Sequence, residues 1–344
     1  MNWLKGDPMK SVKVFLLIAA AAYLNAANLV GQSSAVATHV AAAKAAAGTV
    51  WPSLVKSLCG SAEGPPPPPA PAAAPAPATP PPPPPRSAWY HEPVKVFDNV
   101  YLLPQMIPES LNGVSSWAIT TSGGIILIDT LYDYSVKEGI DAALKSVRLN
   151  PANIKAAFVT HGHGDHFGGA KYLQELYSTS IYAGALDWDL MQASANAGSL
   201  GQPIPKKDLV ATNGMKYTLG DTTITVYLTP GHTPSTLSFL IPVKINGQPH
   251  VAAFWGGTAI SRNSREDNLK VYSESARRFK EIVTQAKADI MLSNHDAYGE
   301  YFAKIEQMKK NPSGPNPFVV GTDGVRRYLD VLDHCGQAQV AAKL

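Results

Sequence analysis

The sequence predicts an α/β fold in which helices cover both outer faces of paired strand segments. Residues 87–344 contain two successive series of strands, and a helix and one further strand follow each series. The whole chain of 344 residues is 45% hydrophobic and 16% charged, which provides a sizeable apolar core and excludes wholesale disorder. Because each sheet must bury its apolar face, we expect the helices to pack on the outside of the two series.

Apolar and β-branched runs bounded by turn residues predict the individual strands. The first series has strands over Val94–Leu103, Trp117–Thr121 and Ile125–Asp129, a helix over Val136–Ser146, and a strand over Ala156–Thr160. The second series has strands over Thr222–Leu228, Leu237–Pro242 and Val251–Trp255, a helix over Glu274–Lys287, and a strand over Ile290–Ser293. The two series are alike in architecture, but no residue string repeats, so an internal duplication is only suspected.

Residues 1–27 have the layout of a secretory signal peptide. The apolar run VFLLIAAAAYL at 14–24 follows lysines and precedes three small residues. The run is too short to span a bilayer as a helix; a buried helix is the alternative interpretation, and Met9 is an alternative start. The context of Cys59 lacks the small residues that a lipoprotein signal requires, so we expect a soluble, exported, periplasmic protein.

Two segments separate this leader from the strands. Residues 28–62 are rich in alanine and could form one or two short helices despite Gly48 and Pro52. Residues 63–86 form a proline-rich linker with 14 of the chain's 29 prolines, which favours a semi-rigid polyproline II spacer over a ligand for a proline-reading domain. Cys59 and Cys335 lack the spacing of a zinc site, and they could form one disulfide in an oxidising compartment.

The sequence His161-Gly162-His163-Gly164-Asp165-His166 carries the chemistry. It places four strong metal ligands in a loop between the predicted strand ending at 160 and a helix near Ala170. The glycines allow tight turns, so 161 and 163 can serve one ion, and 165 and 166 another. Imidazole and carboxylate ligands favour zinc, and a catalytic pair of ions needs further ligands from elsewhere.

Two other histidines follow predicted strands at places where a ring could turn toward this loop. His232 lies in the rigid turn Thr229-Pro230-Gly231-His232-Thr233-Pro234, and His295 follows Ser293-Asn294. His39, His91, His250 and His334 have neither paired spacing nor a matching motif, so we do not expect them to be ligands.

These motifs together resemble the metallo-β-lactamase fold superfamily, and the likeness covers residues 90–344. It depends on Asp129 at a strand end, His161-x-His163-x-Asp165-His166, Gly231-His232-Thr233 and Asn294-His295. The sequence is most similar to subclass three of the class B enzymes, because a histidine follows the motif aspartate and no later bridging carboxylate or cysteine is present. The resemblance implies a four-layer αββα sandwich and a catalytic domain over 87–344.

The resemblance also implies a site with two zinc ions. His161, His163 and His232 would bind the first ion, and Asp165, His166 and His295 would bind the second, each with a position open for water. Asp129 would hydrogen-bond the metal loop from behind.

The activity that the resemblance implies is hydrolysis of the β-lactam ring of antibiotics. A hydroxide shared by the zinc ions would attack the lactam carbonyl, with Asp165 as the catalytic residue that orients the hydroxide. Thr258, Ser261 and Arg262 would contact the substrate carboxylate. Ser235 after the GHTP turn and the Gly256-Gly257-Thr258 segment depart from the subclass, so substrate recognition is open.

Three alternatives accompany this interpretation. The same site could hydrolyse a lactone, a thioester or another acyl substrate, or the chain could be a metal-binding or cell-wall protein without activity. The long segment from Met191 to Met215 could be a lid or a mere connection. We expect a small-molecule partner and no stable membrane insertion. The net charge of +3, about +1 without the leader, indicates no nucleic-acid partner.

Overall fold

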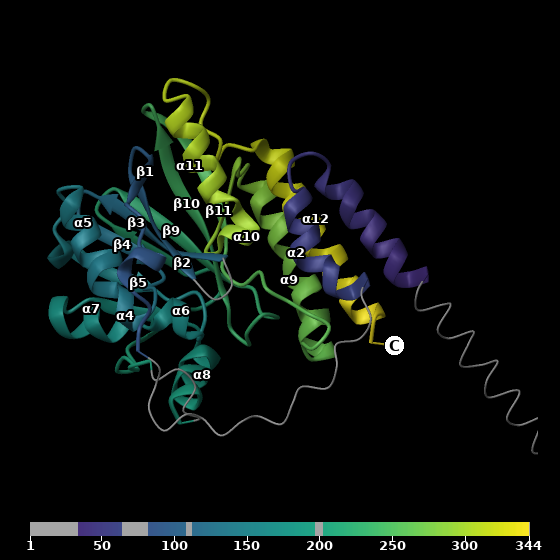
Figure 1. Cartoon of the computed structure of the whole chain (residues 1–344), viewed down its shortest axis with the longest axis horizontal. Coiled ribbons are helices and arrows are strands. Elements are labelled where there is room, and N and C mark those ends of the chain that lie inside the picture. Colours follow the sequence, from purple (N-terminus) through teal and green to yellow (C-terminus); the bar gives the residue numbers. More distant parts are fainter. Residues whose placement is uncertain (1–33, 64–81, 108–111, 197–201, 344) are drawn as a thin grey trace, which may run out of the picture.

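Two β-sheets lie face to face at the centre of the protein (Figure 1). The structure, a computed structural model, describes residues 34–63, 82–107, 112–196 and 202–343. The predicted signal peptide, residues 64–81 of the predicted linker and part of the predicted lid lie outside the described residues. The seven-stranded sheet contains β1 (Val94–Phe97), β2 (Val100–Ile107), β3 (Asn112–Thr121), β4 (Gly124–Ile128), β5 (Ile154–Phe158), β6 (Ser180–Ala183) and β7 (Leu209–Val210). The five-stranded sheet contains β8 (Lys216–Leu219), β9 (Thr222–Leu228), β10 (Leu237–Ile245), β11 (Gln248–Trp255) and β12 (Ile290–Ser293).

Both sheets combine an antiparallel part with a parallel crossover. In the first sheet β1 to β4 are antiparallel neighbours, and β5 to β7 then add in parallel. In the second sheet β8 to β11 are antiparallel, and β12 adds in parallel beside β11. The carboxyl ends of β4, β5 and β12, which are all parallel to a neighbour, therefore reach one edge of the sandwich.

One predicted strand is wrong in outline. The sequence predicted a single strand over Val94–Leu103, but the structure forms a hairpin, because the chain turns between β1 and β2. The turn residue Asp98 accepts hydrogen bonds from the backbone N–H groups of Asn246 and Gly247 in the β10–β11 turn. The pair of polar residues at 98 and 99 thus ends β1 and binds the second sheet.

Helices cover the outer face of each sheet, as the sequence predicted (Figure 1). The first layer contains α4 (Asp133–Val136), η1 (Lys137–Ala142), α5 (Ala143–Ser146), α6 (Gly164–Phe167), α7 (Ala170–Tyr177) and α8 (Ala185–Asn196). The second layer contains α2 (Pro52–Glu63), α9 (Glu266–Gln285) and α12 (Gly321–Ala341). The short helices α3 (Arg86–Trp89), α10 (Asp296–Gly299) and α11 (Tyr301–Lys310) lie in connections. The predicted αββα sandwich is confirmed.

Three apolar cores hold the four layers together. Between the sheets, the ring of Phe254 packs edge-on against Trp117 and Phe239, with ring centroids 6.1 Å and 5.9 Å away. Helix α9 turns a stripe of buried residues toward the second sheet, with successive members three or four positions apart, at Leu269, Tyr272, Ala276, Phe279 and Val283. A third core lies between the first sheet and its helices.

The helices that precede the proline-rich segment belong to the second helical layer. Residues 34–47 are helical, and α2 follows them. The indole N–H of Trp51 donates to the carbonyl of Gly324 in α12, at 2.8 Å. Cys59 in α2 and Cys335 in α12 form a disulfide. Both are fully buried, so this part of the chain packs into the core and is covalently bound to it.

The described part of the chain contains no helix that is both long and apolar enough to cross a membrane.

Candidate metal centre

Four segments bring the predicted ligands to one edge of the sandwich. The loop 159–163 and the first turn of α6 follow β5 and supply four of them. The turn after β9 supplies His232, and the end of β12 supplies His295. These segments meet because β5, β9 and β12 all end at the same edge of the sandwich. The ligands therefore come together although they lie as far apart as 161 and 295 in the sequence.

The six residues form two groups of three, divided as the resemblance implies. In His161, His163 and His232, one candidate ligand atom of each lies within 4.8 Å of the others, and the same holds for Asp165, His166 and His295. The Nε2 atoms of His161 and His232 are 3.1 Å apart. The Nε2 atoms of His166 and His295 are 3.2 Å apart, and Oδ2 of Asp165 lies 3.3 Å and 3.4 Å from them.

In four of the histidines, His161, His166, His232 and His295, Nε2 faces the other ligands and Nδ1 makes a hydrogen bond that fixes the orientation of the ring. The Nδ1 atoms of His232 and His295 lie 2.6 Å and 3.1 Å from the carbonyl oxygens of Ala259 and Gly113. A carbonyl oxygen only accepts, so Nδ1 carries the proton in both rings. In a neutral ring the Nε2 lone pair is then free and points at the other ligands. This is the tautomer that a metal-binding histidine needs.

Asp129 organises the loop from behind. It is fully buried, and its φ of 63° is unusual for a residue with a side chain. Its carboxylate lies 2.7 Å from Nδ1 of His166 and accepts from the backbone N–H and the hydroxyl of Thr160. Because the Thr160 hydroxyl donates to Asp129, its oxygen accepts from Nδ1 of His161, 3.0 Å away. Asp129 therefore orients one histidine of each group, one of them directly.

Asn294 completes this buried network. Its amide nitrogen donates to Asp129 at 3.2 Å, to the Thr160 hydroxyl at 3.1 Å, and to the carbonyl of Gly256 at 2.8 Å. It thereby joins β12 to the ends of β4, β5 and β11. Thr160 was not predicted to have a role, because a threonine at a strand end carries no signal of its own.

Burial keeps most of the cluster neutral. It lowers the pKa of His232 to about 3 and that of His295 to about 4, and it holds the pKa of His161 well below its usual value, with His166 adding to the effect. His166 behaves in the opposite way. Burial disfavours its charge, but the carboxylates of Asp165 and Asp129 outweigh burial and raise its pKa to about 10.

The donor set fits divalent metal ions. Free lone pairs on Nε2 atoms 3.1 Å apart repel each other unless a cation or a proton lies between them, and His161 and His232 are held in that arrangement. In the second group the raised pKa of His166 keeps a proton on its Nε2, which lies 3.2 Å from Nε2 of His295 and 3.3 Å from Oδ2 of Asp165, and a cation among these three atoms would replace that proton. Three imidazoles, or two imidazoles with a carboxylate, are typical catalytic zinc sets. The number and identity of the ions remain predictions.

Two of the three residues predicted to contact a substrate carboxylate, Ser261 and Arg262, have other side-chain partners in this structure. Thr258 is buried, and its backbone carbonyl accepts from the Tyr272 hydroxyl at 2.9 Å. The Ser261 hydroxyl accepts from the backbone N–H of Asn263. The Arg262 guanidinium donates to the carbonyl of Ala62 at the end of α2. A substrate-binding role for Thr258, Ser261 and Arg262 stays a prediction.

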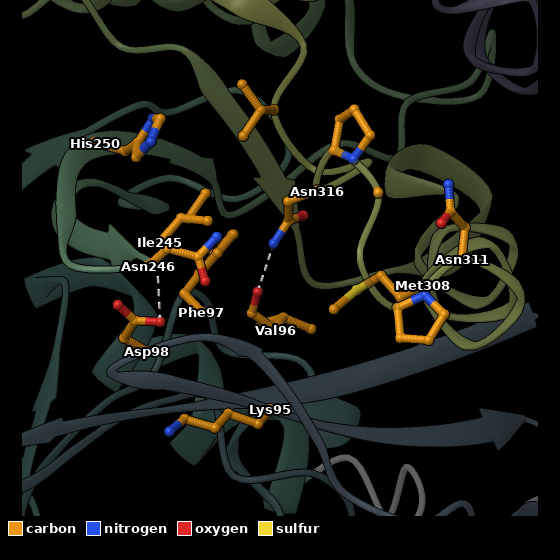
Figure 2. Close-up of a pocket in the computed structure, with 14 residues that line it drawn as sticks. Lys95, Val96, Phe97, Asp98, Ile245, Asn246, His250, Met308, Asn311 and Asn316 are labelled. Atoms are coloured by element: carbon orange, nitrogen blue, oxygen red, sulfur yellow. Dashed lines mark hydrogen bonds between the residues drawn. The ribbon is translucent and has the colours of Figure 1, made fainter.

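The four histidines that were not expected to bind metal lie outside both groups. His250 pairs with Asp289 through Nδ1, at 2.6 Å, beside a cavity of about 590 Å³ at another edge of the sandwich (Figure 2). His39 and His334 face each other with ring centroids 6.1 Å apart, and His91 packs on Phe302.

Part of the predicted lid lies beside the metal loop. Just before the predicted lid, Asp187 and Leu190 of α8 pack on Gly162, where an added Cβ would lie 2.9 Å from the Asp187 carbonyl. Within the predicted lid, Gln202 contacts the metal loop. Gln202 covers Gly164, and its side-chain oxygen accepts from the backbone N–H of Asp133 at 2.9 Å. Residues 197–201 of the predicted lid lie outside the described part, and its role as a lid stays a prediction.

Comparisons with known proteins agree with this geometry. The model of the metallo-beta-lactamase superfamily matches residues 110–244. A probable metallo-hydrolase of Bacillus subtilis is 29% identical over 58% of this chain and 86% of its own length. The hydroxyacylglutathione hydrolase of a Synechococcus strain is 28% identical over 37% of this chain and 43% of its own length.

Solved structures show the same fold. The FEZ-1 metallo-β-lactamase of Legionella gormanii superposes with a TM-score of 0.62 at 22% identity, covering 71% of this chain and 93% of its own. BJP-1, a subclass B3 metallo-β-lactamase of Bradyrhizobium japonicum, gives a TM-score of 0.61 at 25% identity, covering 71% and 92%. Residues 110–244 thus belong to the metallo-beta-lactamase superfamily of metal-dependent hydrolases, and the chain around them has the fold of that superfamily.

Proposed function

We propose that the protein is a zinc-dependent hydrolase that opens the β-lactam ring, with two ions held by the two groups of three ligands. The second group, Asp165 with His166 and His295, carries this proposal. It provides a complete ligand set for a second ion without a bridging carboxylate, which is the pattern of subclass three in the resemblance.

The segment after β11 supports the same choice. In the lactonase, glyoxalase and phosphodiesterase branches an aspartate after a later strand commonly bridges the ions, whereas here the chain has Gly256 and Gly257. A Cβ at 256 would lie 1.9 Å from the Leu237 carbonyl, and one at 257 would lie 2.9 Å from Cβ of His232. The backbone passes too close for a side chain at either position, so this segment supplies no bridging ligand.

The protein's own side chains hold and orient the reacting groups. When bound, the two ions would supply an acidified water and a Lewis acid for the carbonyl oxygen. Asp165 faces the nitrogen atoms of His166 and His295, and its carboxylate is positioned to accept a proton from a nucleophile between the two groups. Burial opposes its charge, but His166 and His295 keep its pKa below the usual range, so it is an anion at neutral pH. Asp129 and Asn294 hold the rings in place.

We also propose that the protein acts outside the reducing cytosol. The disulfide between Cys59 and Cys335 supports this location, because buried structural disulfides persist in oxidising compartments. Cell fractionation would test it: the full-length chain should be recovered in the periplasmic fraction with its leader removed, and recovery in the cytosol with free thiols would contradict it.

A substrate panel tests the activity. The purified protein would be loaded with zinc and assayed with a penicillin, a cephalosporin, a carbapenem, a lactone and a thioester, with and without a chelator. We expect β-lactam turnover to exceed the other two by at least about 100-fold in kcat/KM and to disappear with the chelator. Preferred turnover of the thioester would instead favour the function named for the Synechococcus relative.

Two matched carboxylate variants locate the activity. Asp165→Asn should lower kcat on the order of 10²-fold or more, because it removes the proton acceptor and a ligand. Asp289→Asn changes a carboxylate that also faces a histidine, 2.6 Å away, but at another edge, and it should leave kcat within about threefold. Equal losses in the two variants would mean that activity does not arise at the candidate site.

A further inference from the structure

Asp187 is a buried carboxylate that contacts both segments of the first ligand group. It lies in the first turn of α8 and is fully buried. Its Oδ1 accepts from the backbone N–H of Gly162, at 2.7 Å. Its Oδ2 accepts from the backbone N–H of Ser235, at 2.8 Å, and from the Ser235 hydroxyl, at 2.7 Å. The Ser235 oxygen in turn accepts from the backbone N–H of Asp187, at 2.9 Å.

The two partners of Asp187 flank the three ligands of the first group. Gly162 stands between His161 and His163, and Ser235 follows His232 by three residues in the turn after β9. One carboxylate thus joins the two loops that the first ion would join. The two loops are far apart in the sequence, with some 70 residues between Gly162 and Ser235.

Close packing of the backbone fixes the contact of α8 with the Gly162 loop and its contact with the Ser235 turn. A Cβ on Gly162 would lie 2.9 Å from the Asp187 carbonyl, and a Cβ on Gly184 would lie 2.2 Å from the Ser235 carbonyl. The backbones therefore meet without an intervening side chain, and α8 cannot shift without moving both loops. A buried carboxylate with three donors is costly to build unless all three bonds are kept, which makes the arrangement specific.

We infer that Asp187 and Ser235 are positioning residues for the first metal ion. They set the separation between the His161–His163 loop and the His232 turn, whereas Asp129 orients individual rings, His166 directly and His161 through Thr160. Ser235, which departs from the glycine usual at this place in the resemblance, is in this chain one half of the contact. The inference rests on the metal-binding part of the proposed function and does not depend on the substrate.

Metal affinity, measured without substrate, tests this role. Cobalt(II) binding would be followed by visible absorption and by competition with a chelator in two single-site backgrounds. His295→Ala leaves the first group intact, and His232→Ala leaves the second. Asp187→Asn should raise the cobalt Kd about 10- to 100-fold in the His295→Ala background, as for other outer partners of metal ligands. It should change the Kd by less than about threefold in the His232→Ala background.

Two further variants separate positioning from general stability. Ser235→Ala removes the hydroxyl, which donates to the Asp187 carboxylate and accepts from the Asp187 backbone N–H, but it keeps the bonds from the backbone N–H groups of Gly162 and Ser235. It should raise the first-site Kd by a smaller factor, about 3- to 10-fold, and it keeps the test valid if Asp187→Asn does not fold. Asp141→Asn is the matched control, since Asp141 is also a buried carboxylate, and it accepts from Tyr172 and Tyr177 in the helical layer. It should lower thermal stability and leave both cobalt Kd values unchanged.

The comparison of the cobalt Kd at the two sites decides whether Asp187 and Ser235 are positioning residues for the first site. The inference is supported if Asp187→Asn and Ser235→Ala weaken the first site alone and shift the cobalt absorption band of that site. It is overturned if both sites weaken alike, or if neither weakens beyond the Asp141→Asn control. Because no hydrolysis is measured, a wrong substrate assignment would leave this result unaffected.

Discussion

Two histidine–carboxylate pairs of the described residues are alike in geometry, and one lies at the candidate metal centre while the other lies at another edge of the sandwich. His166 lies 2.7 Å from Asp129, and His250 lies 2.6 Å from Asp289. The first pair is fully buried, and its free nitrogen faces His295 and Asp165. The second pair is about one-quarter exposed and lies beside the cavity of Figure 2.

The difference lies in what surrounds each pair. Asp289 also accepts from the backbone N–H of Val251, and its carbonyl accepts from Val320 and Gly321. It therefore binds β11 to the loop before α12, which is a structural task. The free nitrogen of His166 instead faces two further candidate ligands, His295 and Asp165. The two pairs therefore differ in whether other candidate ligands converge on the free nitrogen of the histidine.

The largest expected effect is the difference in zinc content and turnover between two variants that each lack one histidine, His295→Ala at the metal edge and His250→Ala at the other edge. His295→Ala should reduce bound zinc from two ions to one per chain and lower turnover on the order of 10³-fold or more, because a ligand of the second group is lost. His250→Ala should retain two ions and nearly full turnover. Metal analysis of the dialysed variants and steady-state kinetics measure both. Loss of metal in His250→Ala would remove the distinction between the edges.

Removal of the disulfide in the second helical layer should affect the stability of the protein and not its metal binding. Replacing both Cys59 and Cys335 by alanine should lower the free energy of unfolding by about 2–5 kcal/mol, as for other native disulfides. It should leave the zinc content unchanged, because neither edge contacts the bond. Urea denaturation of the variant beside the oxidised protein measures the first quantity. If zinc were lost as well, the outer layer would support the metal edge directly.

Lys304 is a buried lysine that belongs to neither histidine–carboxylate pair, and it makes the stability of the protein depend on pH. Its Nζ donates to the Gly299 carbonyl and lies 4.8 Å from the ring centroid of Trp51. Burial lowers its pKa from 10.5 to about 8. Between these values the unfolded chain binds more protons, so the lysine lowers stability below pH 8, and this penalty disappears as the pH rises to 10.5.

The variant Lys304→Met removes this penalty. We expect it to be more stable than the parent by about 1–3 kcal/mol at pH 7, with the advantage shrinking toward zero near pH 10.5. Lys309→Met on the same helix is the control, because Lys309 is exposed and pairs with Glu306. Thermal unfolding of the three proteins across this pH range gives the comparison. A constant difference between Lys304→Met and the parent would contradict it.

The smallest expected effect concerns Arg262. Its guanidinium donates to the end of α2, so Arg262→Ala should lower stability by about 1–2 kcal/mol and change KM for carboxylate-bearing β-lactams by less than threefold. Calorimetry and initial-rate kinetics measure the two quantities. A KM rise above tenfold would show instead that this side chain leaves Ala62 to bind substrate, as the resemblance implies.

Local patterns predicted the strands that lead to the candidate metal centre. Four ligands lie within six residues, and the strands Thr222–Leu228 and Ile290–Ser293, next to the two remaining ligands, have the predicted bounds. Those strands are short apolar or alternating runs with turn residues at both ends, which a sequence pattern can delimit.

Contacts between distant segments could not be predicted in the same way. Asp187 carries no motif, and its role depends on how α8 meets two loops that lie 25 and 48 residues away. The hairpin at Asp98 depends on the β10–β11 turn, almost 150 residues later. The packing of α2 on α12 joins nearly opposite ends of the chain. In each case the decisive partner is chosen by tertiary packing.

The bond between Cys59 and Cys335 closes a covalent ring that contains both sheets and all six ligands. The proline-rich segment at 64–81 lies within this ring. A single proteolytic cut there would open the ring without releasing either piece, since the helices before the cut stay bonded to α12. The nicked protein should migrate as one species on a denaturing gel without reductant and as two species with it.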